Sequence, residues 1–373
     1  MDGGIAAERK RGELLMTDYL TTDTELTSIA NAIRTKGGTS ASLTYPTGFV
    51  DAIDAIPTGG SSSTLLKSII ERTAVTSPTL PDDLTKIGNY VFYNYSSFAL
   101  TSLPSGVTSI GTYAFYGCTA LALASLPSGI TSLGNYAFYG CSNISLTSLP
   151  SGITTIGYAV FQNCTNITLT SLPSGVTSIG SNAFYGCSNV VLTSLPSGLT
   201  SVGNMAFSGT GITSIVIPSG LKNITDAFRN CTHLTSISGN SVTTISGNGL
   251  SGCTSLVDAR FPNYSSALSA NAFGSCNNLA VADIGSAISI YANAFSSCYK
   301  LQTLVLRKTG SICPLANVSA FTNTPMSGYN SLTGTVYVPS ALISSYKTAS
   351  NWSTLYNNGT LTFAAIEGSP YEL

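Results

Sequence analysis

Apolar and polar positions recur in a fixed order along most of this chain. A Leu-Pro pair returns every 23 residues, with its leucines at Leu103, Leu126, Leu149, Leu172 and Leu195. A phenylalanine column keeps the same step, at Phe92, Phe115, Phe138, Phe161, Phe184 and Phe207. A fixed period of this length is typical of a solenoid, in which each repeat is one coil that buries its apolar side against its neighbours. We therefore predict a mainly β repeat solenoid over residues 64–325.

Each coil contains three short segments whose patterns predict local structure. Leu-Thr-Ser-Leu-Pro and Val-Thr-Ser-Ile-Gly each predict a short strand, and Tyr-Ala-Phe-Tyr-Gly-Cys predicts a single helical turn with Ala, Phe and Cys on one side. The phenylalanine column continues less regularly through Phe228, Leu250, Phe273, Phe295 and Phe321, which gives eleven coils. A second inward column is expected three residues after each cysteine, at Leu121, Ile144, Ile167, Val190, Leu234, Leu256, Leu279 and Leu301.

The flanks of the repeat predict smaller modules. Residues 1–15, which precede Met16, are interpreted as an upstream extension or an artificial addition. Residues 16–57 predict a small helical attachment module, which opens on the capping box Thr22 to Glu25 and is too small to be stable alone. Residues 58–63 predict a flexible linker. Residues 326–373 predict a cap made of a strand ending at Pro339 and a helix beginning at Ser340.

The amino-acid composition limits the classes of partner that we expect for this chain. Charged residues make up 8% of the chain, against about 25% in a typical soluble domain, and the formal net charge is −1. We therefore expect no nucleic-acid partner. No segment approaches the roughly 18 consecutive apolar residues of a membrane helix, so we expect no membrane insertion. No apolar stretch follows Arg9, Lys10 and Arg11, so we also expect no secretory signal peptide.

The cysteines follow the repeat. Eight of the nine lie three residues after the phenylalanine column, and Cys313 stands outside it. There is no Cys-x-x-Cys, and His233 is the only histidine, so the sequence predicts no metal site. We expect a column of buried, reduced thiols, with disulfides between coils as the alternative.

The repeat contains few side chains that could take part in catalysis. From Ile87 to Leu221 the chain contains no Asp, Glu, His, Lys or Arg, and general acid–base catalysis needs a titratable group near the substrate. Asp258 and Asp283 lie about one coil apart and are the best candidates for a carboxylate pair. We interpret them, and His233, as ordinary surface residues. The sequence therefore predicts no catalytic residue and no cofactor.

Tyrosines form the best candidate binding surface. They lie two residues before and one residue after the phenylalanine column, at Tyr90, Tyr93, Tyr113, Tyr116, Tyr136 and Tyr139. Stacked coils are expected to line them up as an exposed ladder on the face opposite Ala, Phe and Cys. Such a ladder suits neutral sugars or protein surfaces, because tyrosine gives a large contact area at low entropy cost. The alternative is that the ladder only stiffens the solenoid.

The coil sequence from Leu126 to Cys141 resembles the BspA-like (Treponema-type) leucine-rich repeats. The resemblance covers about residues 64–325 and implies a solenoid with parallel sheets, of a kind found in bacterial surface adhesins and other attachment proteins; it implies no catalytic residue. Residues 17–49 resemble the N-terminal module of tail-associated and other structural proteins from phages and prophages of Gram-positive hosts. Residues 335–352 resemble the closing segment of that group.

These observations predict a non-enzymatic phage or prophage virion protein that uses its solenoid for host-surface attachment. Residues 16–57 are expected to bind other virion proteins and to favour a homo-oligomer, and the solenoid to bind a host glycan or protein. The protein is then expected in the virion after assembly in the host cytoplasm. The alternatives are a bacterial cell-surface adhesin of the same class and an architectural or decoration protein without a ligand.

Overall fold

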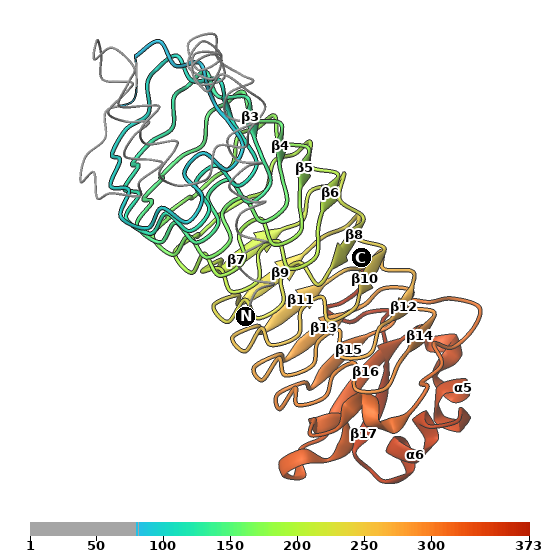
Figure 1. The fold of residues 1–373 in the computed structure, drawn as a ribbon. Coiled ribbons are helices and arrows are strands. Elements are labelled where there is room, and N and C mark those ends of the chain that lie inside the picture. The colour runs from blue at the N-terminus through green and yellow to red at the C-terminus, as the bar shows by residue number, and fades with distance from the viewer. Residues whose placement is uncertain (1–79, 81) are drawn as a thin grey trace, which may run out of the picture. The chain divides into compact units, whose positions relative to one another are not determined.

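The structure is a computed structural model that describes residues 80 and 82–373 (Figure 1). The predicted extension 1–15, helical module 16–57 and linker 58–63 lie outside the described residues. The chain divides into two compact units. Unit 1 contains the residues up to Ile153 together with Gly157–Ile167, and unit 2 contains Thr154–Ile156 and Thr168–Leu373. Each unit is a stack of coils joined by parallel strands, which confirms the prediction of a mainly β solenoid.

Unit 1 contains one sheet with the order β1-β2-β3, made of β1 (Lys86–Ile87), β2 (Ser109–Ile110) and β3 (Ser132–Leu133). The pairing is parallel, and each strand is in register with its neighbour one repeat later, as in Ile110 opposite Leu133. The apolar residue of each strand is buried and the polar residue before it faces outward. The predicted strand in Val-Thr-Ser-Ile-Gly is therefore confirmed.

Unit 2 contains four parallel sheets. Three are small: β4 (Thr155–Ile156) with β5 (Ser178–Ile179) and β6 (Ser201–Val202); β8 (Asn223–Thr225) with β10 (Thr244–Ser246); and β12 (Ala267–Leu268) with β14 (Ser289–Ile290). The fourth has seven strands in the order β17-β16-β15-β13-β11-β9-β7. Its members are β7 (Ser214–Val216), β9 (Ser236–Ser238), β11 (Asp258–Arg260), β13 (Val281–Asp283), β15 (Thr303–Val305), β16 (Gly334–Val338) and β17 (Leu361–Ala365).

The other predicted strand, in Leu-Thr-Ser-Leu-Pro, is absent from the described coils before β7, so this prediction is wrong for them. The buried leucines there are three residues apart, as at Leu123 and Leu126, whereas a strand places every second side chain on one face. At strand β7 of the seven-stranded sheet the buried residues are two apart, at Ile215 and at Ile217 just beyond its end, and Val216 between them is exposed. The coils before β7 therefore lack the alternation that a strand needs, and the later coils have it.

The predicted helical turn in Tyr-Ala-Phe-Tyr-Gly-Cys is also wrong, because this segment is a run of tight turns. Tyr113 and Gly117 have φ of 57° and 69°, in the left-handed region. Backbone N–H groups alternate between two destinations: that of Tyr116 donates to Tyr113 in its own coil, and that of Phe115 donates to Ala137 in the next. The turns thus join neighbouring coils, which a helical turn with only local hydrogen bonds does not do.

The C-terminal cap contains the predicted strand but not the single helix. Strand β16 ends at Val338 as expected, and β17 adds a further parallel strand. The predicted helix is divided into η4 (Ser340–Leu342), α5 (Ile343–Thr348) and α6 (Trp352–Asn357), because the chain is extended at Ala349 and Asn351 has a φ of 64°. Three further 3₁₀ helices precede β16: η1 (Val318–Phe321), η2 (Pro325–Ser327) and η3 (Tyr329–Ser331).

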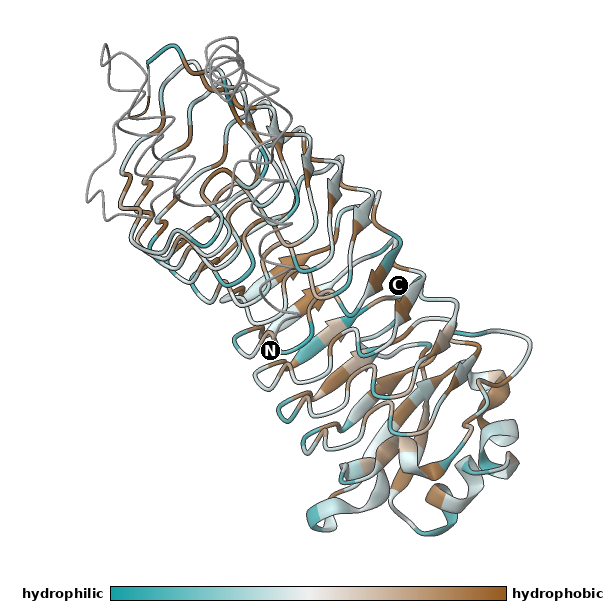
Figure 2. Ribbon diagram, viewed as in Figure 1, coloured by the Kyte–Doolittle hydropathy of each residue, from teal (hydrophilic) through white to brown (hydrophobic). Residues whose placement is uncertain are grey.

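The core consists of columns of identical residues, and hydrophobic positions recur from coil to coil in Figure 2. Phe115 and Phe138 stack with ring centroids 5.5 Å apart in unit 1, and Phe295 and Phe321 stack at 5.6 Å in unit 2. Trp352 then packs against Phe321 at 5.8 Å and closes the column. The predicted second inward column is confirmed, because all eight of its members are fully buried. No helix among the described residues has the length and apolar character needed to span a membrane.

Candidate tyrosine ladder and polar sites

The six predicted tyrosines form two parallel columns in unit 1, which we call the tyrosine ladder. In the first column the ring centroids of Tyr90 and Tyr113 are 4.9 Å apart and those of Tyr113 and Tyr136 are 4.5 Å apart. The second column contains Tyr93, Tyr116 and Tyr139, with spacings of 4.9 and 4.5 Å. Within the columns the rings are nearly parallel, with interplanar angles of 5–17°. The structure thus brings all six predicted residues together.

The two columns also contact each other. Tyr113 and Tyr116 of one coil have centroids 5.6 Å apart and are tilted by 51°. Tyr93 meets Tyr113 of the following coil edge-on at 6.0 Å. The six rings therefore form one continuous aromatic surface. Each ring is half-buried by its neighbours, so the ladder is less exposed than the sequence predicted.

The backbone under the first column has an unusual conformation for tyrosine. Tyr90, Tyr113 and Tyr136 have φ of 59°, 57° and 58°. Bulky residues rarely adopt this left-handed region, and holding one there costs about 1–3 kcal/mol. Stacking with the next ring contributes about 0.5–1.5 kcal/mol per pair in the opposite direction. The ring contacts therefore offset a conformation that tyrosine alone disfavours.

The ladder ends at a defined place. In the next coil Ala159 takes the position of Tyr136 and Gln162 takes the position of Tyr139. Tyr158 lies one residue earlier, with its ring 5.0 Å from that of Tyr136 and tilted by 54°. Its exposed fraction is 40%, which makes it one of the exposed large aromatic residues. The sequence analysis did not include Tyr158, although its place directly after Gly157 was visible.

Two phenol groups of the ladder stay protonated to unusually high pH. Burial, followed by hydrogen bonding and electrostatic contact with Tyr158, raises the pKa of Tyr136 well above its ordinary value. Burial and the neighbouring hydroxyls of Tyr139 and Tyr93 raise the pKa of Tyr116 in the same way. These two phenols are therefore uncharged at neutral pH.

The cysteine column is part of the core. The eight in-register cysteines are free and buried, as predicted, and so is Cys313, for which no prediction was made. The thiol of Cys141 donates to the carbonyl oxygen of Phe115 in the preceding coil at 2.9 Å, and Cys164 donates to Phe138 in the same way. Burial raises the pKa of Cys118 and Cys313 to about 12. A nucleophilic cysteine needs a lowered pKa and access to solvent, so these thiols are structural.

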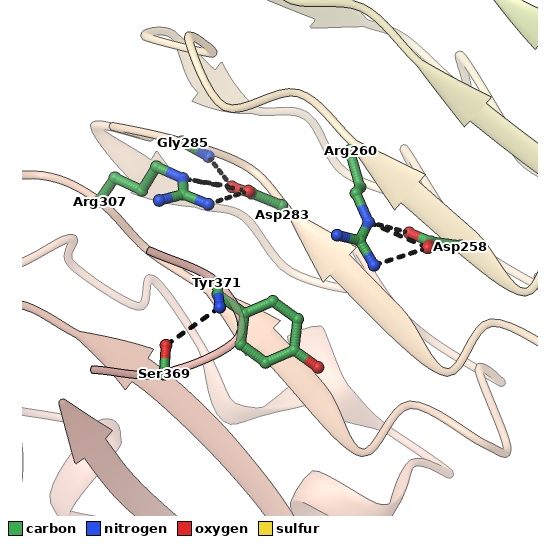
Figure 3. A network of polar contacts seen from close by, with 7 residues as sticks. All are labelled: Asp258, Arg260, Asp283, Gly285, Arg307, Ser369 and Tyr371. Carbon is green, nitrogen blue, oxygen red and sulfur yellow. Dashed lines mark hydrogen bonds and ion pairs between the residues drawn. The ribbon is translucent and has the colours of Figure 1, made fainter. Parts of the chain in front are cut away.

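The two candidate carboxylates are each bound by an arginine on the outer face of the seven-stranded sheet (Figure 3). Arg307 bonds both oxygens of Asp283, with its Nη2 2.6 Å from Oδ2, and the backbone N–H of Gly285 also donates to this carboxylate. Arg260 binds Asp258 at 2.9 Å. The strand register places Arg260, not Asp258, opposite Asp283. The carboxylates therefore do not face each other as a glycosidase pair would.

The C-terminal residues add an aromatic contact that the sequence analysis missed. The centroids of the Tyr371 and Tyr337 rings are 4.8 Å apart. The guanidinium carbon of Arg260 lies 5.9 Å from the centroid of the Tyr371 ring. The interpretation of Asp283 as an ordinary surface residue is wrong, because it is buried with 3% exposure, and its ion pair with Arg307 was also missed. His233 is exposed, as predicted, and its Nδ1 lies 3.5 Å from Thr232 Oγ1. Within the described part of the chain, no group of three or more potential ligands is placed to hold a metal.

The regular coils, the phenylalanine and cysteine columns and the parallel sheets match one known family. The model of the BspA type leucine-rich repeat region, which comprises six copies, matches residues 64–191, 154–280 and 226–338. The chain belongs to the BspA type leucine-rich repeat family. Most of the chain lies within these matches, so the resemblance seen in the repeat sequence is confirmed.

Several solved structures are similar to this chain, and the first of those below supports the same fold. A leucine-rich repeat protein from Bacteroides ovatus is 24% identical, with a TM-score of 0.51 over 78% of this chain and 84% of that one. A leucine rich cell surface protein from Faecalibacterium prausnitzii is 25% identical over 68% of this chain and 83% of its own, with a TM-score of 0.38. A leucine-rich repeat protein from Eubacterium ventriosum is 23% identical over 69% and 79%, with a TM-score of 0.45. No curated protein matches the chain.

Proposed function

We propose that this BspA-type repeat protein is a non-enzymatic attachment protein and that the tyrosine ladder of unit 1 is its recognition surface. A solenoid offers long, regular surfaces suited to binding. The observation that carries the proposal is the ladder itself: six tyrosines gathered in three successive coils, three of them in a conformation that tyrosine disfavours. Strain of this kind is concentrated at functional sites.

The proposed ligand lies on a cell surface, and the proposed carrier is a phage or prophage virion. The resemblance of residues 17–49 and 335–352 to tail-associated proteins supports that carrier. Residues 16–57 then bind other virion proteins and favour a homo-oligomer. The rival carrier is the bacterial cell surface, which suits the repeat class equally well. An antibody against the protein distinguishes the two: on gradient-purified particles it marks a virion component, and on intact cells of the producing strain it marks an adhesin.

A binding assay tests the recognition surface. Fluorescently labelled protein is incubated with a panel of Gram-positive cells, and the variant carrying Tyr113→Ser, Tyr116→Ser, Tyr136→Ser and Tyr139→Ser is compared with the wild type. We expect the variant to lose most of its binding, because each aromatic contact contributes about 0.5–1.5 kcal/mol.

The matched controls lie in unit 2. Tyr291 is a tyrosine with 49% exposure, and Asp258 is the more exposed of the two candidate carboxylates. Tyr291→Ser and Asp258→Asn should leave binding unchanged. Binding that survives the four ladder changes but fails in either control would reject the ladder as the recognition surface.

A further inference from the structure

The ring faces of the two central tyrosines of the ladder are already occupied. Tyr116 is covered on one face by Tyr93 and on the other by Tyr139, at centroid distances of 4.9 and 4.5 Å. Tyr113 is covered in the same way by Tyr90 and Tyr136. A ligand ring therefore has no space to stack on these two central tyrosines. Ring-face contact with a sugar or a base is thus excluded in the middle of the ladder.

The ladder offers its ring edges and hydroxyl groups instead. Parallel stacking sets the rings of one column 4.5–4.9 Å apart, and the hydroxyls follow each other at a similar spacing. Each hydroxyl has one donor and two acceptor positions, so the bonds between neighbours, such as Tyr116 with Tyr139 and Tyr136 with Tyr113, do not use all of them. The surface is therefore a double row of hydrogen-bonding groups with a regular repeat along the solenoid.

The tyrosine ladder lies in an uncharged stretch of the chain. From Ile87 to Leu221 there is no Asp, Glu, His, Lys or Arg, and the raised pKa values of Tyr116 and Tyr136 keep these two phenols neutral. A charged ligand would lose hydration here without gaining a partner of opposite charge. A neutral ligand with many hydroxyl groups loses less hydration free energy. It can also form hydrogen bonds with the tyrosine hydroxyls, which both donate and accept.

We propose that the ladder binds a neutral glycan chain through the tyrosine hydroxyls, with the chain running along the columns across successive coils. This inference rests on the proposed function and adds the ligand class and the mode of contact. An extended chain is required because the hydroxyls repeat in one direction over three coils. Affinity then grows with the number of sugar units until the ligand covers the ladder.

The test uses the quadruple variant Tyr113→Phe, Tyr116→Phe, Tyr136→Phe and Tyr139→Phe. It keeps the stacked rings and removes only the hydroxyls, so the fold is retained, which circular dichroism checks. The probes are an array of neutral oligosaccharides of glucose, mannose and N-acetylglucosamine from two to six units, with hexameric uronates as charged counterparts. We expect neutral hexamers to bind the wild type more tightly than dimers and uronates. The phenylalanine variant should lose about 10- to 100-fold in affinity, since each hydrogen bond contributes modestly.

Three results would overturn the inference. Undiminished binding by the phenylalanine variant would show that ring contacts, not hydroxyls, hold the ligand. Equal binding of uronates would reject the neutral class, and the absence of binding to any neutral glycan would reject the glycan. The serine variant on whole cells separates these failures from failure of the proposed function. Loss of cell binding by the serine variant together with full retention by the phenylalanine variant leaves the ladder as the attachment surface and rejects only the hydroxyl mode.

Discussion

The two units place different residues at the same position of the coil. Two residues before the phenylalanine column, unit 1 has Tyr90, Tyr113 and Tyr136 and then Ala159, whereas unit 2 has Asn182, Asn271 and Asn293 together with Met205. All eight have φ between 51° and 59°. Asparagine adopts this conformation readily, and tyrosine does not. The coil holds several residue types in this conformation, and the tyrosines of unit 1 are the ones that also stack on each other.

The units also differ in how they use charge. Unit 1 is uncharged beyond Ile87, and its polar surface consists of hydroxyls and amides. Unit 2 carries two carboxylate–arginine pairs on the outer face of its seven-stranded sheet. Each carboxylate there is bound by an arginine, which gives it a structural role. The difference supports the proposal that unit 1 is the recognition surface, whereas the charged pairs of unit 2 are satisfied within its own sheet.

The largest expected effect is on the pH dependence of stability, and it comes from the buried cysteines that both units contain. Burial raises the pKa of Cys231 to about 11 and that of Cys118 to about 12, while an unfolded thiol titrates near about 8.5. The folded state therefore keeps protons that the unfolded state loses. Stability should be complete below about pH 8.5 and fall above it, by about 1.4 kcal/mol per pH unit for each such thiol. Urea unfolding at pH 7.5, 9 and 10 with reductant present measures this slope, and a constant stability up to pH 10 would contradict the buried column.

The next effect separates the two ion pairs of unit 2. The Asp283 and Arg307 side chains are 5% and 12% exposed, whereas those of Asp258 and Arg260 are 35% and 48% exposed. Asp283→Asn leaves a nearly buried guanidinium without its partner and should cost about 3–5 kcal/mol. Asp258→Asn is the matched control and should cost less than about 1 kcal/mol. Urea unfolding followed by Trp352 fluorescence measures both, and equal losses would show that burial does not distinguish the pairs.

The smallest expected effect comes from exchanging tyrosine and asparagine between the two units. Asn293→Tyr puts tyrosine into the same conformation without a stacking column and should destabilise by about 1–2 kcal/mol. Tyr136→Asn relieves the backbone but removes the stacking, so stability should change by less than about 1 kcal/mol. Thermal unfolding of both variants checks the pair. A stabilising Asn293→Tyr would show that the coil favours tyrosine for its own sake.

Much of this architecture was predictable from the sequence, because a solenoid repeats its contacts with its residues. The 23-residue step aligned the phenylalanines, cysteines and tyrosines in the columns that the structure shows. The tight turns were not predicted, since Tyr113 in the left-handed region contradicts the local preference of tyrosine and is held there by hydrogen bonds to the next coil. The absence of a strand in the coils before β7 could have been predicted, because Leu123 and Leu126 are three residues apart in the sequence.

The site was predictable only in part. The tyrosine positions followed from the repeat, but the coverage of their ring faces depends on side-chain angles that the sequence does not specify. The ion pairs of Asp258 and Asp283 depend on the register of strands β11, β13 and β15. One arginine partner, Arg260, lies two residues from its carboxylate, and the other, Arg307, lies one coil away. Spacing alone left the two carboxylates as a candidate pair, and only the structure showed that each is held by an arginine.

Hydroxyl-radical footprinting on bound cell envelopes tests the central claim most directly. The protein is oxidised free and bound to envelopes of a cell that it recognises, and the modified residues are located by mass spectrometry. The account predicts that binding protects Tyr113, Tyr116, Tyr136 and Tyr139 and leaves Tyr291 of unit 2 unchanged. Protection of Tyr291 with an unprotected ladder would contradict the assignment of recognition to unit 1.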